Sequence, residues 1–121
     1  MLTIEPRHGR SSRTWSLSVR GDVFQLKAPR DARGHEQQGN RFAVVVQSDL
    51  LPLSTWLVAP TSTSARPASF RPEVEIGGKT SLVLVEQIAA IDPERLGQLV
   101  GHLSQREMAA VDVAVRTVLH V

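Results

Sequence analysis

Short hydrophobic runs with the length and spacing of β-strands cover most of the first three quarters of the chain. Apolar and polar residues alternate from Trp15 to Arg20, and "VFQLKA" (23–28) continues this strand pattern after a bend or bulge predicted at Gly21. Three further strands are predicted at "RFAVVVQS" (41–48), "TWLVAP" (55–60) and "EVEI" (73–76). The diglycine of "GGKT" predicts a turn, and "SLVLVEQIAAI" predicts a strand whose end carries the polar pair Glu86–Gln87.

Two long polar segments separate these strands. Residues 27–40, "KAPRDARGHEQQGN", contain one proline, two glycines and mixed charges, and predict a loop that is too long to be only a connection. The second segment, "TSTSARPASFRP" (61–72), is rich in Ser, Thr and Pro and also predicts a loop. Residues 1–14 show no periodicity, so we expect residues 1–18 to form a flexible extension and residues 19–121 to form the domain.

Helical signals are concentrated at the C-terminal end. Asp92 followed by Pro93 predicts the start of a helix that continues through "ERLGQLV" (94–100). Ser104 and Glu107 have the spacing of a capping box. The apolar residues behind that box recur at helical spacing and predict a helix that packs on the sheet or on a partner; they are Met108, Val111, Val115 and Val118.

These elements predict a mainly β protein with helices, built as a small, curved antiparallel sheet or partly open barrel with a C-terminal helix. A chain of 121 residues with 41% hydrophobic side chains has enough apolar surface for one compact domain. Strands do not alternate with long crossover helices, which argues against a doubly wound parallel sheet.

Charge is unevenly distributed, although the net charge is only +2. Residues 1–41 contain eight Lys and Arg against four acids, whereas residues 42–121 contain six against eight. A basic first third favours a polyanionic partner, because Lys and Arg release counterions from phosphates. The alternative is a solvated, arginine-rich tail. Only 4% of residues are aromatic, which makes an extended base-stacking platform improbable.

The absence of cysteine excludes disulfides and thiolate metal sites. No run reaches the roughly 18 apolar residues that span a bilayer, and the first ten residues lack the apolar region of a signal peptide. We therefore expect a cytoplasmic protein that does not bind membranes.

Metal-dependent hydrolysis and nucleophilic triads find no support in the sequence. The four histidines lack H-x-x-x-H or H-E-x-x-H spacing, and no G-x-S-x-G, P-loop or G-x-G-x-x-G motif occurs. We accordingly expect neither a metal ion nor a cofactor.

One chemistry that remains open is RNA cleavage through the RNA's own 2′-OH. It needs a base, a cation for the charged phosphorane and an acid for the leaving 5′-oxygen. Arg41 is a candidate for the charge, and His35 or Glu36 for proton transfer. A hydroxyl group that donates to a phosphate oxygen is offered by Thr61, Ser62 or Thr63. Each has a structural alternative: Glu36 pairs with Arg41, His35 caps a turn, and Ser62 satisfies backbone groups at a strand end.

Several blocks of the chain resemble the MazF/PemK family of toxin endoribonucleases, in the order found in that family. They are "RGDVFQL", "RGHEQQGNRFAVVVQSD", "LVAPTSTS", "LVLVEQIAAID" and "RLGQLVGHLSQREMAAVD", and together they cover roughly residues 19–118. The resemblance implies an SH3-like β-barrel that forms a homodimer. It also implies metal-independent cleavage of single-stranded RNA at short motifs, with 2′,3′-cyclic phosphate and 5′-hydroxyl products. A cognate MazE-like antitoxin whose extended segment covers the RNA groove is implied as an inhibitor.

The resemblance also assigns site residues. Arg41 matches the family's catalytic arginine, Glu36 and His35 match the acid and histidine of the "GHEQ" block, and Ser62 matches the Thr or Ser after the "VPIT"-like strand. Glu86 falls where some members have a catalytic-site Asp. We expect further residues around this site to contact RNA: Lys27, Arg30, Arg33, Gln37, Gln38, Thr61, Thr63, Glu86 and Gln87.

The chain departs from the family pattern at two positions. Phe42 stands where the family usually has Pro, and Leu84 stands where members that use a proton relay have an Arg. These departures keep open a catalytically weak or inactive paralogue that binds RNA or antitoxin. A gyrase-poisoning toxin of the same fold is a third hypothesis, and the C-terminal "TVLHV" counts against it because such toxins end in a Trp-Gly-Ile type of sequence.

Overall fold

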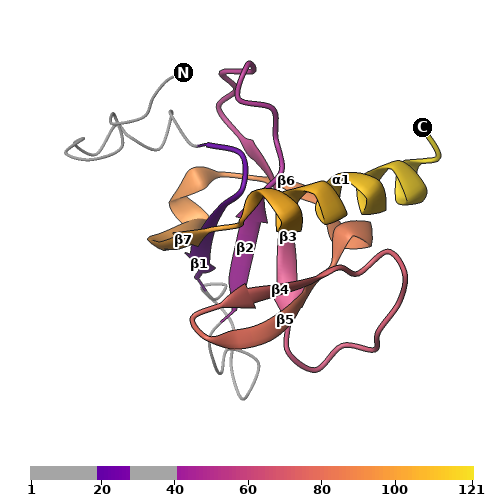
Figure 1. Ribbon diagram of the computed structural model, residues 1–121. Helices are drawn as coiled ribbons and strands as arrows, with labels where there is room; N and C mark the ends of the chain where they lie inside the picture. The colour runs from indigo at the N-terminus through magenta and orange to yellow at the C-terminus, as the bar shows by residue number, and fades with distance from the viewer. Residues whose placement is uncertain (1–18, 28–40) are drawn as a thin grey trace.

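The computed structural model describes residues 19–27 and 41–121, in which an antiparallel sheet curls into a half-barrel under one helix (Figure 1). The strands are β1 (Asp22–Leu26), β2 (Phe42–Val45), β3 (Trp56–Ser62), β4 (Glu73–Ile76), β5 (Lys79–Val83), β6 (Ala89–Ile91) and β7 (Leu96–His102). Short 3₁₀ turns, η4 (Val85–Gln87) and η5 (Pro93–Arg95), flank β6, and the helix α1 spans Gln105–Leu119. The predicted small antiparallel barrel with a C-terminal helix is confirmed.

The strands follow the order β4-β5-β3-β2-β1-β7. Strand β6 pairs with the beginning of β3 (56–58), on the edge whose end pairs with β5. The β4–β5 hairpin closes through Gly77 and Gly78, which both have positive φ angles, so the predicted diglycine turn is confirmed. Gly21 also has a positive φ, 96°, and forms the predicted bend immediately before β1.

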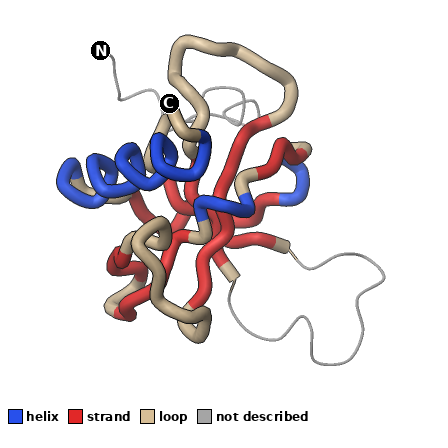
Figure 2. The backbone as a smooth tube through the Cα atoms, turned by 90° about the vertical axis from the view of Figure 1, so that its right-hand side faces the viewer, coloured by secondary structure: helices blue, strands red, loops and turns tan. Residues whose placement is uncertain are grey.

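Two hydrophobic clusters lie on the two faces of the sheet. The first lies between the sheet and α1 and includes Val23, Val44, Val83, Val111 and Ala114. On the other face, Trp56 packs with Val45, Val58 and Leu96, and its ring contacts that of Phe24 with centroids 5.7 Å apart. Figure 2 shows α1 along one side of the strands, so the helix covers only one face of the sheet.

The helix α1 begins as predicted. The Ser104 side chain accepts the Glu107 N–H at 3.0 Å, and Glu107 accepts the Ser104 N–H at 2.8 Å, which completes a capping box. Met108, Val111 and Val115 pack against the core, whereas Val118 is more exposed. No helix among the described residues is long and apolar enough to cross a membrane.

The helix predicted over residues 94–100 is wrong. Asp92 does cap a turn, since its side chain accepts the Glu94 N–H at 2.9 Å, but η5 ends at Arg95 and the chain enters β7. Gly97 weakens a helix there, and pairing with β1 satisfies the backbone instead. Tertiary pairing therefore overrides the local helix signal.

The strand predicted over residues 81–91 is broken in two. Thr61 lies opposite Val83 and Val58 lies opposite Ala89. Between these two pairs, β3 has two residues (59–60) and the facing segment has five (84–88). The turn η4 absorbs the three extra residues, and Glu86–Gln87 lie on this turn rather than at a strand end. Residues 15–18 of the first predicted strand lie outside the described residues, and β1 begins at Asp22.

Candidate active site

Arg41 immediately precedes β2 and Ser62 ends β3, so the two residues stand at the same end of neighbouring antiparallel strands. The Leu26 N–H donates to the Arg41 carbonyl oxygen at 2.8 Å, which fixes the backbone at the start of β2. Ala43 lies opposite Pro60, and the same register continued by two residues places Arg41 opposite Ser62. Directly opposed residues of antiparallel strands share a face and have Cβ atoms about 5 Å apart. On this register the Arg41 and Ser62 side chains project from the same face of the sheet.

The Ser62 hydroxyl is held by the backbone that follows it. Its oxygen accepts the Ser64 N–H at 3.1 Å and the Ala65 N–H at 2.9 Å. The alternative that Ser62 satisfies backbone groups at a strand end is therefore confirmed. This role occupies the lone pairs of the oxygen and leaves the O–H to donate. The structural role thus fixes a hydrogen-bond donor beside Arg41.

Thr61 and Thr63 differ in accessibility. Thr61 is only 5% exposed, and its hydroxyl donates to the Phe42 carbonyl oxygen at 3.3 Å, so its visible role is to support the backbone next to Arg41. Thr63 is exposed at the beginning of the loop after β3. Phe42, which replaces the usual Pro of the family, packs against the cluster under α1.

Other cations lie at the same end of the sheet as Arg41. Lys27 follows β1; its N–H donates to the Arg95 carbonyl oxygen and its ammonium to the Glu94 carbonyl oxygen, both at 3.0 Å. Lys27, Arg41 and Arg95 are all exposed. This end therefore presents three positive charges, of which the sequence had indicated Lys27 and Arg41 but not Arg95.

Glu86 binds an arginine that the sequence patterns did not single out. Its Oε2 accepts hydrogen bonds from Arg71 Nε at 3.1 Å and Nη2 at 2.6 Å, and Gln87 Nε2 lies 3.5 Å away. Glu86 Oε1 is buried and has no donor among the described residues. Leu84, at the position of the relay arginine, is buried in the core, so Arg71 reaches Glu86 from the loop between β3 and β4 instead.

The Arg71–Glu86 pair sets the protonation state of both groups. The hydrogen bond from Arg71 lowers the pKa of the Glu86 carboxyl, against burial, which would raise it. The same bond raises the pKa of Arg71 above its already high value. Glu86 is consequently a carboxylate at neutral pH and is unsuited to act as an acid for the leaving oxygen.

Six predicted site residues lie outside the described residues, within 28–40: Arg30, Arg33, His35, Glu36, Gln37 and Gln38. Their roles stay predictions. Within residues 19–27 and 41–121, no group of three or more His, Cys, Asp or Glu side chains is arranged to hold a metal ion.

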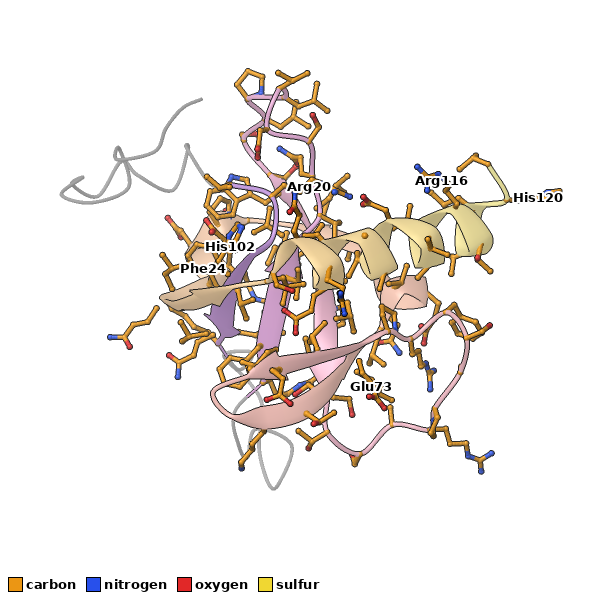
Figure 3. The ribbon with its side chains drawn as sticks, in the orientation of Figure 1. Arg20, Phe24, Glu73, His102, Arg116 and His120 are labelled. Atoms are coloured by element: carbon orange, nitrogen blue, oxygen red, sulfur yellow. The ribbon has the colours of Figure 1, made fainter. Side chains whose placement is uncertain are left out.

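A second pair that sequence reasoning missed lies at the opposite end of β1. His102 Nδ1 lies 2.9 Å from Asp22 Oδ1, and the second oxygen of Asp22 accepts the Val19 N–H at 3.1 Å. Figure 3 shows His102 near the beginning of α1. The partners are 80 residues apart, so no local spacing indicated them.

Comparison with known proteins gives a family match over residues 19–119, to the family described as the PemK-like, MazF-like toxin of type II toxin–antitoxin systems. A candidate toxin of Mycobacterium tuberculosis is 43% identical over 100 residues, which are 82% of this chain and 94% of that protein. Endoribonuclease EndoA of Bacillus subtilis is 33% identical over 105 residues, which are 80% of this chain and 90% of that enzyme.

Solved structures share the fold at lower sequence identity. An endoribonuclease bound to its cognate antitoxin, from a mycobacterial species, superposes with a TM-score of 0.70 at 16% identity, covering 86% of this chain and 96% of that one. The curled sheet with one C-terminal helix is thus the fold of these enzymes.

Proposed function

Because the chain belongs to the PemK-like, MazF-like toxin family of type II toxin–antitoxin systems, we propose that it cleaves single-stranded RNA by 2′-OH transesterification without a metal ion. The enzyme class rests on the relatives, since proteins named endoribonucleases are 33% and 34% identical over about four fifths of the chain. The chain is an endoribonuclease. Its cleavage chemistry, sequence selectivity and partners are our proposals.

The observation that supports the mechanism is the β2–β3 register, which pairs Ala43 with Pro60 and, continued by two residues, brings Arg41 opposite Ser62. In the reaction, the 2′-oxygen bonds to phosphorus, the bond from phosphorus to the 5′-oxygen breaks, and negative charge builds on the non-bridging oxygens in between. Arg41 stabilises that charge with a planar array of donors. Ser62 donates its hydroxyl hydrogen to a non-bridging oxygen, from a position fixed by two backbone N–H groups.

Proton transfer belongs to the loop before Arg41 in this proposal. Glu36 or His35 takes the proton from the 2′-OH, and the other delivers one to the leaving 5′-oxygen. The products are a 2′,3′-cyclic phosphate and a 5′-hydroxyl. Lys27, Arg30 and Arg33 bind neighbouring phosphates, and Gln37, Gln38 and Thr63 contact the bases or sugars. Gln87 and Glu86 act from η4 by supporting the loop that follows Ser62.

In this proposal the chain forms a homodimer and is inhibited by a MazE-like antitoxin. Both interactions take place in the cytoplasm. The structure with a TM-score of 0.70 is an endoribonuclease in complex with its cognate antitoxin, which supports an antitoxin for this chain. An acidic segment of such an antitoxin would suit the cations Lys27, Arg41 and Arg95 at the exposed end of the sheet.

The test is cleavage of a long single-stranded RNA in EDTA by the wild-type chain and by Arg41→Ala. We expect the wild type to cleave and the variant to lose about 10²–10³-fold in rate, because a positioned charge donor is removed. The control Arg106→Ala removes an exposed arginine of α1 and should keep full activity. Cleavage that EDTA abolishes, or an active Arg41→Ala, would contradict the mechanism.

A further inference from the structure

The loop between β3 and β4, residues 63–72, is held in place at both of its ends. At its start, the Ser62 oxygen accepts the N–H groups of Ser64 and Ala65. At its end, the Val83 N–H donates to the Pro72 carbonyl oxygen at 2.9 Å. The loop leaves β3 and returns to the sheet on the two sides of β5, since Leu82 lies opposite both Ser62 and Glu73. Figure 3 shows Glu73 where the loop enters β4, below α1.

Arg71 fastens the middle of this loop to the turn η4. Its guanidinium binds Glu86 through Nε and Nη2, and its Nη1 donates to the Arg66 carbonyl oxygen at 2.9 Å. The Arg71 N–H donates to the Ala68 carbonyl oxygen at 2.9 Å, and the guanidinium carbon lies 5.7 Å from the centre of the Phe70 ring. The Arg71 side chain therefore ties the backbone at Arg66 to η4, and the Arg71 backbone adds a second tie within the loop at Ala68.

This pair can position the loop in addition to stabilising the fold. Glu86 Oε1 is buried without a donor among the described residues, so part of the electrostatic gain is offset by desolvation. Pro67 and Pro72 further restrict the backbone of the loop. The chain thus holds an otherwise polar surface loop in one conformation at a cost, directly after the Ser62 hydroxyl.

The side chains that the loop presents to solvent are suited to RNA. Thr63, Ser64, Arg66 and Ser69 are exposed, and residues 63–72 contain no acidic side chain. Arg66 follows the capped turn at Ser62 and carries a guanidinium whose own backbone carbonyl is fixed by Arg71. Because the backbone that carries Arg66 is fixed, only its side chain remains to be ordered when it binds a phosphate, which reduces the entropy lost on binding.

We propose that Arg66 binds a backbone phosphate of the RNA beside the scissile one, and that the Arg71–Glu86 pair is a positioning device that holds Arg66 there. The proposal rests on the proposed function, because it takes RNA as the ligand and the Arg41–Ser62 end of the sheet as the reaction site. It adds Arg66 to the phosphate contacts and gives Glu86 a positioning role rather than the direct RNA contact expected from the sequence.

The experiment measures how binding to a single-stranded 2′-O-methyl RNA depends on salt. This probe lacks the attacking hydroxyl, so binding is read without cleavage. Arg66→Gln should weaken binding severalfold at low salt and reduce the slope of log K against log[salt] by about 0.7, the value of one lost phosphate contact on a single strand. Arg106→Gln removes an equal charge from α1 and should leave the slope unchanged.

Glu86→Ala tests the positioning role, because the positioning role and simple electrostatics predict opposite changes in RNA affinity. The substitution makes the chain more positive, so charge alone predicts tighter RNA binding. Loss of the Arg71–Glu86 pair instead predicts weaker binding and a salt slope reduced as in Arg66→Gln. The double variant that combines Glu86→Ala with Arg66→Gln should then bind only slightly more weakly than either single variant. Glu75→Ala removes an equal charge from β4 and should bind at least as tightly as the wild type. Circular dichroism establishes that each variant is folded.

The outcomes separate this proposal from the proposed function. If the wild type cleaves RNA but Arg66→Gln keeps the wild-type salt slope, the phosphate contact is refuted and the enzyme mechanism stands. If Glu86→Ala binds more tightly than the wild type, the positioning role is refuted. If the wild type binds the probe and shows these changes but never cleaves RNA, the proposed reaction fails and the binding loop stands. A wild type that does not bind the probe overturns the loop proposal.

Discussion

Replacing Ser62 separates its two roles, because the hydroxyl oxygen and the hydroxyl hydrogen do different work. Ser62→Ala removes the acceptor for two backbone N–H groups, at 3.1 and 2.9 Å. Each such bond contributes about 0.5–1.5 kcal/mol, and at this partly exposed turn we expect the free energy of unfolding to fall by about 1–2 kcal/mol. The lost donor to the phosphorane should lower the cleavage rate by about 10²-fold.

Two further substitutions at Ser62 distinguish these effects. Ser62→Thr keeps both the acceptor and the donor, so stability and activity should both remain close to wild type. Ser62→Asp keeps an acceptor for the turn but has no hydroxyl hydrogen when ionised, and we expect a stable but inactive protein.

The assays are urea denaturation at one protein concentration and the initial rate of RNA cleavage. A Ser62→Ala variant that cleaves at the wild-type rate would refute the donor role. So would a Ser62→Asp variant that remains fully active.

Three predictions concern the fold around the site. Ser104→Ala removes the capping box of α1 and should lower the free energy of unfolding by about 1 kcal/mol in urea denaturation without changing the cleavage rate. A decrease of less than about 0.2 kcal/mol would contradict the role of the cap. Gly21→Ala should destabilise by about 1–3 kcal/mol in thermal unfolding, because φ is +96° and the added Cβ would lie 3.1 Å from the His102 ring; an unchanged melting temperature would refute this strain. The pKa of Glu86 is lowered in the folded state by its hydrogen bond with Arg71, so its ionised form stabilises the fold above the unfolded pKa of about 4.3, and this contribution is lost as the pH falls through the folded pKa. Arg71→Gln should therefore flatten the acid limb of the stability curve, and an identical limb would contradict the assignment.

Local signals predicted those parts of the fold whose causes are local. The Ser104–Glu107 spacing marked the start of α1, and the two glycines at 77–78 marked a hairpin turn, because each motif contains both partners of the interaction that stabilises it. The helix expected over residues 94–100 failed for the opposite reason. Its Asp92 cap was real, but the fate of the next seven residues depends on pairing with β1, some 70 residues earlier.

The site was predictable to a similar extent. Strand periodicity predicts that Ser62 lies on the same face as Trp56, Val58 and Pro60, and that Thr61 lies on the other face with Ala59. The Arg71–Glu86 pair was not predictable, because a loop of irregular backbone brings Arg71 to a turn 15 residues later. The sequence blocks that resemble the family indicated the fold correctly, because they extend over nearly the whole domain in the family's order rather than depending on one local motif.

The central claim is that the chain cleaves RNA through the RNA's own 2′-OH, with Arg41 stabilising the phosphorane. Its most direct test is to digest a long single-stranded RNA with the wild-type chain in EDTA and to identify the new ends at each cleavage site. The account predicts a 2′,3′-cyclic phosphate on one side of every cut and a 5′-hydroxyl on the other, at a small set of sequence motifs. Ends that carry a 5′-phosphate and a 3′-hydroxyl would require water as the nucleophile and would contradict it.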